Sequence, residues 1–414
     1  MAMMNNKVIG AVGLTVLGAM LAWRVLVTGL AEYYAGRDTP EADAGALSWR
    51  SDQSVALYRQ GLALAERDPA AAKRLFQAAA WANPTDALVY LALAELQAGA
   101  GQPSVATALM ETADALGPMR TPVLARSAAF WLAQSRPDLT LARWDMLLRN
   151  RPATADQLYP LLLRWVESVE TRPLLRPLLA DPPQWWDKFF AYVAAKAARL
   201  ESVVFLYRNR ERAGRLPEAA EQKVYLGRLW REGHWLESYL TWLSGLDERQ
   251  QQGLGNIYNG DFELPVTGLG FDWRISTPRG ALVEITETYG THGGKALHVT
   301  FNGQRVRFRH VRQPLYLEPG RYRLQGRVRP DGLRAERGLR WMVRCGESGG
   351  RLLSEGPSFT GGSGDWQLFT QEFTIPEADC PVQWLRLELE GRAELDFEAQ
   401  GGIWFDDLAI SRQG

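Results

Sequence analysis

The sequence is poor in the residues that bind transition metals and that hold disulfide-rich folds together. Its 414 residues include only four histidines and two cysteines. A metal enzyme that depends on clusters of histidine and cysteine is therefore nearly excluded. Lysine is scarce as well, since only six of the 47 basic residues are lysine and the rest are arginine.

The chain also has no net charge at pH 7, because its 47 acidic residues balance its 47 basic ones. A protein that binds nucleic acid over a broad basic surface is therefore not expected. The balance conceals two opposed blocks. Residues 305–344 hold 12 arginines and three acids, a local charge of +9, and residues 345–414 hold four arginines and 13 acids, a local charge of −9. Either these blocks pair across neighbouring strands, or the arginines are free to bind an anionic or hydroxyl-rich polymer.

An apolar stretch near the N-terminus, residues 8–31, is long enough to span a lipid bilayer if Arg24 reaches the headgroups. A cleaved signal peptide is the alternative, but Met20-Leu21-Ala22 lacks the pair of small residues that marks a cleavage site. Lys7 favours a cytoplasmic N-terminus. The excess of arginine, with abundant alanine, is typical of a GC-rich bacterial genome. We therefore expect a single-pass protein of the inner membrane, with most of its chain in the periplasm.

Residues 42–250 show the spacing of apolar positions that is typical of helices. Prolines recur here every 34 residues in two interlocking series, namely Pro69, Pro103 and Pro137, and Pro84, Pro118 and Pro152. The first series stands where the second helix of a pair would begin, and the other where that helix would end. The pattern predicts helices over 70–82, 104–116 and 138–150. An unrelated helical bundle with chance prolines is the alternative.

This period resembles the tetratricopeptide repeat over residues 52–152. The small residues that the family uses for close helix packing are matched by Ala72, Ala79, Ala106 and Ala113, whereas Thr140 and Leu147 replace them in the third repeat. The resemblance implies a solenoid that docks partner proteins. We expect seven tryptophans at helical spacing to lie between helices: Trp81, Trp131, Trp144, Trp165, Trp230, Trp235 and Trp242. One of Trp185 and Trp186 is expected to point outward.

The composition changes at residues 250–255, where glycine becomes frequent and a period of two replaces the helical spacing. We predict eight short strands, among them one over 306–317 and two, over 322–328 and 339–345, divided by a turn at Pro330-Asp331-Gly332. Such strands favour an antiparallel β-sandwich, a jelly roll. The chain is thus expected to be a multidomain α + β protein with a membrane anchor and linker (1–41), helical repeats (42–250) and a jelly roll (254–414).

Four motifs occur in order in the C-terminal part: Asn259-Gly260-Asp261-Phe262-Glu263, residues 294–299, residues 317–322 and residues 404–410. In this order they resemble the jelly-roll carbohydrate-binding modules of families 4, 9 and 22. The resemblance implies a structural calcium ion, held by the side chains of Glu263 and Asp406 and by main-chain carbonyls near Asp261 and Lys295. Alternatively, the two carboxylates pair with arginine or cap turns.

Strand alternation indicates which residues would contact a glycan. Arginines and a tryptophan on shared strand faces would offer hydrogen bonds beside a stacking ring, although each tryptophan taken alone is more often a core residue. The candidate glycan-binding residues are Arg305, Arg307, Arg309, Trp384, Arg386 and Glu388.

Cys345 and Cys380 are the only cysteines, and outside the cytoplasm such a pair favours a disulfide over two free thiols. The segment Gly346-Glu347-Ser348-Gly349-Gly350 matches the G-x-S-x-G pattern, but no helix is predicted after it, so we interpret it as a loop. The sequence contains no H-E-x-x-H motif, phosphate loop or dinucleotide fingerprint. We therefore expect no enzyme.

Together these expectations resemble accessory proteins of exopolysaccharide or surface-glycan assembly. The hypothesis is a scaffold in the bacterial cell envelope that docks partner proteins through its helical repeats and contacts polysaccharide through its jelly roll. The alternative is a pure protein-interaction scaffold whose jelly roll is structural, and a glycan-acting enzyme is a third possibility.

Overall fold

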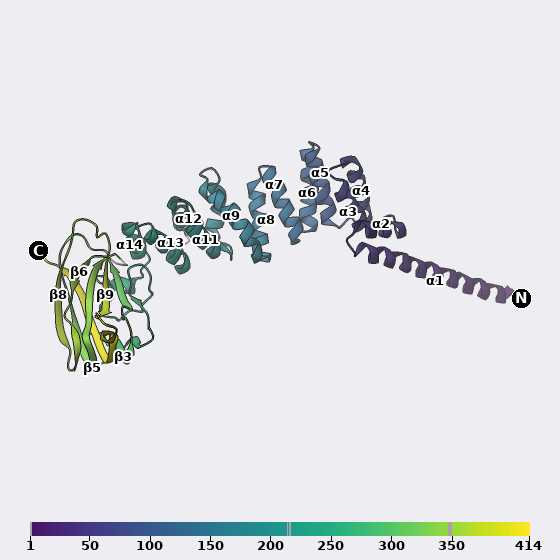
Figure 1. Ribbon diagram of the computed structural model, residues 1–414. Helices are drawn as coiled ribbons and strands as arrows, with labels where there is room; N and C mark the ends of the chain where they lie inside the picture. Colours follow the sequence, from purple (N-terminus) through teal and green to yellow (C-terminus); the bar gives the residue numbers. More distant parts are fainter. Residues whose placement is uncertain (1, 213, 215–216, 347–349) are drawn as a thin grey trace. The chain divides into compact units, whose positions relative to one another are not determined.

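The computed structural model describes residues 2–212, 214, 217–346 and 350–414 (Figure 1). It divides into two compact units, Met1–Trp186 and Asp187–Gly414. The described part of the first unit is built of helices, and the second unit joins helices to a β-sandwich. The chain is therefore a multidomain α + β protein, as predicted.

The N-terminal apolar stretch forms helix α1 (Ala2–Ala35). Its portion Gly10–Ala35 is long and apolar enough to cross a membrane, a property that membrane spans and signal sequences share. Helix α2 (Pro40–Trp49) follows, and the side chain of its N-cap residue Thr39 accepts a hydrogen bond from the backbone N–H of Ala42 at 3.2 Å.

The next six helices pack as three consecutive pairs (Figure 1). The pairs are α3 (Ser54–Leu64) with α4 (Pro69–Ala82), α5 (Ala87–Gly99) with α6 (Pro103–Leu116), and α7 (Thr121–Ala133) with α8 (Pro137–Asn150). The second helix of each pair begins at a proline, since the first turn of a helix does not need that residue's N–H. Each of these helices ends where the sequence predicts, and the pairs fit a repeat solenoid.

Small residues let the paired helices approach closely. Ala72, Ala79, Ala106 and Ala113 are fully buried. A Cβ atom on Gly61 would lie 2.4 Å from the Phe76 ring, so α3 and α4 meet at a position that only glycine fits. The larger Thr140 and Leu147 of the third pair are buried as well.

Two expectations about tryptophan are wrong. Trp81 near the end of α4 is 89% exposed rather than packed between helices. Trp185 and Trp186 are both buried, so neither points outward. The Trp185 Nε1 donates a hydrogen bond to Asp145 at 2.8 Å, which satisfies the polar edge of the buried ring.

Further helices continue along the chain: α9 (Ala155–Glu167), α10 (Arg176–Ala180), α11 (Trp186–Lys196), α12 (Leu200–Arg212), α13 (Ala219–Arg231), α14 (Trp235–Ser244) and α15 (Glu248–Gln252). Helices α13 and α14 share a buried apolar cluster with the sandwich. In this cluster Leu226 and Trp242 from the helices pack with Tyr258, Phe271 and Val382. The C-terminal unit therefore has helices as part of its core.

The ten described strands of the sandwich form one hydrogen-bonded antiparallel sheet, and its long strand β5 (Gly320–Cys345) joins the two layers of the sandwich. The first half of β5 pairs with β8 and β10, and its last residues pair with β9 and β6. We call the layer β2-β3-β10-β5-β8 sheet I and the layer β1-β4-β9-β5-β6 sheet II, and β7 pairs with the middle of β5. The other strands are β1 (Arg274–Ile275), β2 (Ala281–Glu287), β3 (Lys295–Arg305), β4 (Val311–Leu315), β6 (Leu352–Glu355), β7 (Phe359–Ser363), β8 (Gln367–Ile375), β9 (Gln383–Leu389) and β10 (Glu398–Arg412).

Two strand predictions need correction. The expected turn at residues 330–332 is absent from the described chain, because β5 runs through it and passes from one sheet to the other. Gly332 has φ +67° at a register shift, which bends the strand without ending it. The strand predicted over 306–317 is shorter, since Val306 donates its N–H to the carbonyl of Phe397 at 2.9 Å and the chain becomes irregular before β4.

Candidate functional site

The predicted tryptophan of the glycan surface is part of the core. Trp384, Arg386 and Glu388 share the outer face of β9, as the alternation predicts, but Trp384 is fully buried. Its ring meets Trp230 of α13 edge-on, with the centroids 5.8 Å apart. The guanidinium of Arg274 lies 4.8 Å from the Trp384 centroid. A ring enclosed in this way offers no open face for a sugar.

The predicted arginines lie in different surroundings. Arg305 pairs with Glu398 at 2.8 Å, and Arg307 pairs with Glu394. Arg309 and Arg386 instead line one cavity of about 740 Å³, together with Arg274, His310 and Arg312. Burial, and then the positive charges of Arg309 and Arg312, lower the pKa of His310. The structure therefore brings Arg309 and Arg386 together and places Arg305 and Arg307 elsewhere.

The two opposed charge blocks pair extensively with each other. Arginines of residues 305–344 contact acids of residues 345–414 across the strands, which favours the ion-pair interpretation over a free arginine face. The pairs are Arg305–Glu398 (2.8 Å), Arg323–Glu372 (2.9 Å), Arg327–Asp407 (3.2 Å), Arg337–Glu390 (3.1 Å), Arg340–Glu355 (3.0 Å), Arg344–Glu388 (3.4 Å) and Arg307–Glu394.

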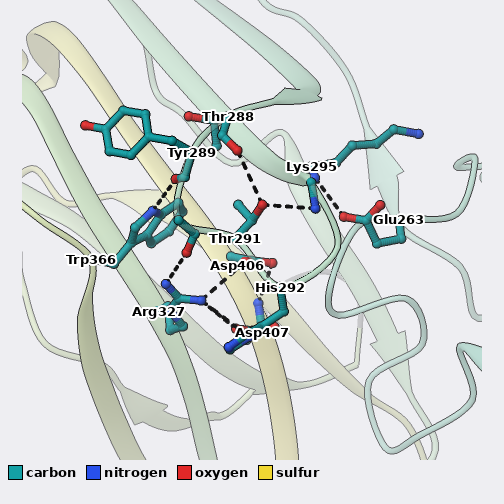
Figure 2. Close-up of polar contacts among 12 residues, drawn as sticks. Glu263, Thr288, Tyr289, Thr291, His292, Lys295, Arg327, Trp366, Asp406 and Asp407 are labelled. Atoms are coloured by element: carbon teal, nitrogen blue, oxygen red, sulfur yellow. Dashed lines mark hydrogen bonds and ion pairs between the residues drawn. The ribbon is translucent and has the colours of Figure 1, made fainter.

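A different set of aromatic and arginine side chains gathers on the outer face of sheet I, and Figure 2 shows part of it. We call Tyr289, Trp366, Trp404, Arg327 and Arg329 the aromatic–arginine cluster. The guanidinium of Arg329 lies over three rings, at 4.0 Å from the Tyr289 centroid, 5.3 Å from Trp366 and 5.0 Å from Trp404. Arg327 lies over Trp366 at 5.0 Å. These cation–π contacts hold the aromatic rings in place next to the guanidinium groups, which are hydrogen-bond donors.

The loop between β2 and β3 carries the most accessible ring of the cluster. Tyr289 is 70% exposed, and its carbonyl accepts a hydrogen bond from Trp366 Nε1 at 2.9 Å (Figure 2). Arg327 donates to the carbonyl of Gly290. Gly290 has φ +75°, and a Cβ there would lie 2.8 Å from the Trp366 ring, so only glycine fits. The loop therefore holds the Tyr289 ring in place over the sheet.

Strand register, rather than sequence spacing, assembles this cluster. Trp404 of β10 pairs with Arg329 of β5 on one side and with His298 of β3 on the other. The His298 and Trp404 rings stack with centroids 3.8 Å apart. The alternating arginines of β5 were a visible signal in the sequence, but Tyr289 and Trp366 come from segments with no motif of their own.

The predicted calcium ligands occupy two places near this loop (Figure 2). Glu263 Oε1 accepts a hydrogen bond from the Lys295 N–H at 2.7 Å. Asp406 is buried, and its Oδ1 accepts from the Asp407 N–H at 2.8 Å. Among the described residues its Oδ2 has no hydrogen-bond partner, and the nearest cation, Arg327 Nη1, is 3.9 Å away.

A buried carboxylate oxygen without a hydrogen-bond partner is suited to ligating a cation. Burial, and then the charge of Asp407, raise the pKa of Asp406 to about 6. The described part of the chain holds no group of three or more His, Cys, Asp or Glu side chains that could hold a metal. An ion at Glu263 and Asp406 would therefore need main-chain carbonyls as well, as the prediction assumed for Asp261 and Lys295. Calcium stays a prediction.

The two cysteines, Cys345 at the end of β5 and Cys380 before β9, are joined by a disulfide. Next to it, Gln383 Nε2 donates to the Cys380 carbonyl at 2.7 Å. Glu347 and Ser348 of the G-x-S-x-G match lie outside the described residues.

Comparison with known proteins gives fold likeness only. No family model and no curated protein matches the sequence. Among solved structures, a family 4 carbohydrate-binding module is 18% identical with a TM-score of 0.28, and the match covers 38% of this chain and 99% of that one. A family 16 module has the same identity and TM-score, with 38% and 100% covered. The CBM22-1 xylan-binding domain from Paenibacillus barcinonensis Xyn10C is 14% identical with a TM-score of 0.26, covering 37% and 91%. The matching part of this chain is its β-sandwich.

Proposed function

We propose that the protein is a non-catalytic, membrane-anchored scaffold whose sandwich binds glycan at the aromatic–arginine cluster. In this proposal α1 holds the chain in the bacterial inner membrane, the bulk lies in the periplasm, and the helical repeats dock envelope proteins that assemble or export polysaccharide. The observation that carries the glycan role is the exposed Tyr289 ring, held beside Trp366 and above the guanidinium of Arg329.

The chemistry of this surface fits a sugar polymer. An exposed tyrosine ring presents an apolar face on which the C–H groups of a pyranose can stack. Arg327, His292 and Asp407 lie beside it and supply donors and acceptors for hydroxyl groups. The cavity lined by Arg309 and Arg386 is the second candidate surface, because its guanidinium groups suit acidic sugars.

The test is retention of the full chain, in detergent, by a panel of neutral and uronic-acid-containing polysaccharides in affinity electrophoresis. We expect Tyr289→Ala to weaken retention by about 5-fold, since stacking of one aromatic ring contributes on the order of 1 kcal/mol. Trp81→Ala is the matched control, because it removes an exposed tryptophan from a helix of the other unit.

Arg309→Ala distinguishes the two surfaces. Loss of retention with Arg309→Ala but not with Tyr289→Ala would move the glycan site to the cationic cavity. If no polysaccharide retains the unchanged chain, the glycan role is contradicted. That result would favour the alternative, a pure protein-interaction scaffold with a structural jelly roll.

We further propose a structural calcium ion at Glu263 and Asp406. Calcium at about 100 times its dissociation constant should stabilise the folded chain by about 2.7 kcal/mol, and Asp406→Asn should abolish this gain. Asp261→Asn should keep it, because only the main-chain carbonyl of Asp261 is proposed as a ligand and its side chain is exposed. Thermal unfolding with calcium and with a chelator measures the effect, and an equal calcium response in all three proteins contradicts the proposal.

Without calcium, the raised pKa of Asp406 predicts a pH dependence. The unfolded carboxyl ionises near pH 3.9 and the folded one at a pKa of about 6, so stability falls as the pH rises through this window. Asp406→Asn removes that loss. In the presence of chelator, the thermal midpoint of Asp406→Asn minus that of the unchanged chain should therefore increase between about pH 4 and pH 6. Above about pH 6 this difference should stay constant.

A further inference from the structure

A groove of about 1120 Å³ lies in the C-terminal unit between α14 and two turns of the sandwich. One turn, residues 316–319, connects β4 to β5, and the other, residues 376–381, connects β8 to β9. The groove lies apart from the aromatic–arginine cluster, since no residue of that cluster lines it. Its volume exceeds the range of about 300–1,000 Å³ typical of small-molecule sites.

One wall of the groove presents unburied leucines. Leu236 and Leu240 of α14 both line it, and each is 54% exposed. They stand four residues apart, so they lie one above the other on the same side of the helix. Another side of α14 is used by the fold, because Trp242 and Tyr239 pack into the cluster shared with the sandwich. The leucines are therefore a surface of the folded unit rather than part of its core.

The rim of the groove is acidic. Four carboxylates line it, against the single guanidinium of Arg208: Glu237, Glu318, Glu377 and Asp379. Glu237 already pairs with Arg208 at 2.9 Å, and Glu318 pairs with Arg412 at 3.1 Å. Glu377 and Asp379 are exposed, and within the described chain neither has a side-chain hydrogen bond or ion pair.

The acidic turn is also held in a fixed conformation. Asp379 has φ +60°, in the left-handed region that few residues other than glycine adopt. The next residue, Cys380, is tied to β5 by the disulfide and to β9 by Gln383. A pre-formed acidic rim around exposed leucines loses little entropy when a ligand binds.

We propose that this groove docks a basic amphipathic segment of a partner protein, whose apolar side chains cover Leu236 and Leu240 and whose lysines or arginines pair with Glu377 and Asp379. The carboxylates would repel an acidic glycan, a nucleic acid or an anionic lipid surface. A neutral glycan would use the carboxylates but would leave the leucines without an apolar partner. This docking surface is separate from the proposed glycan site. It includes α14, a helix of the region 42–250, so the proposal rests on the partner-docking role proposed for that region and specifies where in it a partner would bind.

The probe is a fluorescent 14-residue amphipathic peptide made of leucine and lysine, titrated by anisotropy onto the full chain in detergent. Its controls are the same composition in scrambled order and a peptide with glutamate in place of lysine. We expect the basic amphipathic peptide to bind and both controls to bind at least about 10-fold more weakly. Leu236→Ser with Leu240→Ser should weaken binding by at least about 10-fold, because both anchors are removed.

Variants separate the two contributions. Glu377→Gln with Asp379→Asn should weaken binding and also flatten its dependence on salt, since asparagine tolerates the left-handed conformation and only the charges are lost. Leu368→Ser, which alters an exposed leucine on β8 outside the groove, is the matched control and should change nothing. Circular dichroism and an unchanged thermal midpoint verify that each variant is folded.

Three results would overturn the proposal. They are failure of the basic peptide to bind the unchanged chain, equal binding by the acidic peptide, and equal binding by the leucine variants and the unchanged chain. Loss of polysaccharide retention in the leucine variants would show instead that the groove holds glycan. Because Tyr289→Ala should leave peptide binding intact, failure of this proposal and failure of the glycan role are distinguishable.

Discussion

Replacing Trp384 with alanine is expected to lower the free energy of unfolding of the unit Asp187–Gly414 by roughly 3–5 kcal/mol. The indole is fully buried, so the substitution removes a large apolar surface and leaves a cavity between β9 and α13. For a unit of this size the loss corresponds to a fall of roughly 10 °C in the thermal midpoint. Differential scanning calorimetry of the full chain in detergent measures it.

Trp384→Phe is the matched control, and it should cost much less than the alanine variant. Among the described residues the Trp384 Nε1 has no hydrogen-bond partner, so removing this donor strands no acceptor. Phenylalanine keeps most of the buried ring, and polysaccharide retention should be unchanged. An alanine variant with an unaltered midpoint but lost retention would restore the stacking role that the sequence suggested for Trp384.

Removing the disulfide is expected to lower the free energy of unfolding of the same unit by roughly 3–4 kcal/mol. The bond joins residues 35 apart, and in the chain-entropy model a cross-link of this length restricts the unfolded chain by about that amount. The double substitution Cys345→Ser with Cys380→Ser should shift urea unfolding of the full chain to lower concentration.

A reducing agent should have the same effect on the unchanged chain and none on the double variant. The shift should be confined to the transition of the C-terminal unit, because both cysteines lie in it. Two results would contradict this prediction. The reductant could leave the urea midpoint of that transition unchanged in the unchanged chain, or it could lower the midpoint of the double variant as well.

Helix boundaries were predictable from the sequence because their cause is local. Pro69, Pro103 and Pro137 begin helices since proline fixes φ and lacks an N–H, and both effects operate within one helical turn. Strand alternation likewise identified the sandwich and the shared outer face of Trp384 and Arg386, because side chains alternate within a single strand.

The candidate site was only partly predictable because its causes are long-range. Trp384 is buried by Trp230, which belongs to a helix more than 150 residues earlier, and no pattern within β9 reveals that contact. Tyr289 and Trp366 are 77 residues apart and meet only after the strands of sheet I have taken their register. The two charge blocks show the same limit. Their local charges could be counted in the sequence, but which arginine pairs with which acid depends on which strands are neighbours in the fold.

The shared strand β5 has a consequence for how the sandwich comes apart. Because β5 contributes hydrogen bonds to both sheets, neither sheet can lose its partner strands without disturbing the backbone of the other. A slip of β5 by one residue would turn the buried side chains of both sheets outward together. The sandwich should therefore unfold as one cooperative block, with its slowest amide hydrogen exchange along β5.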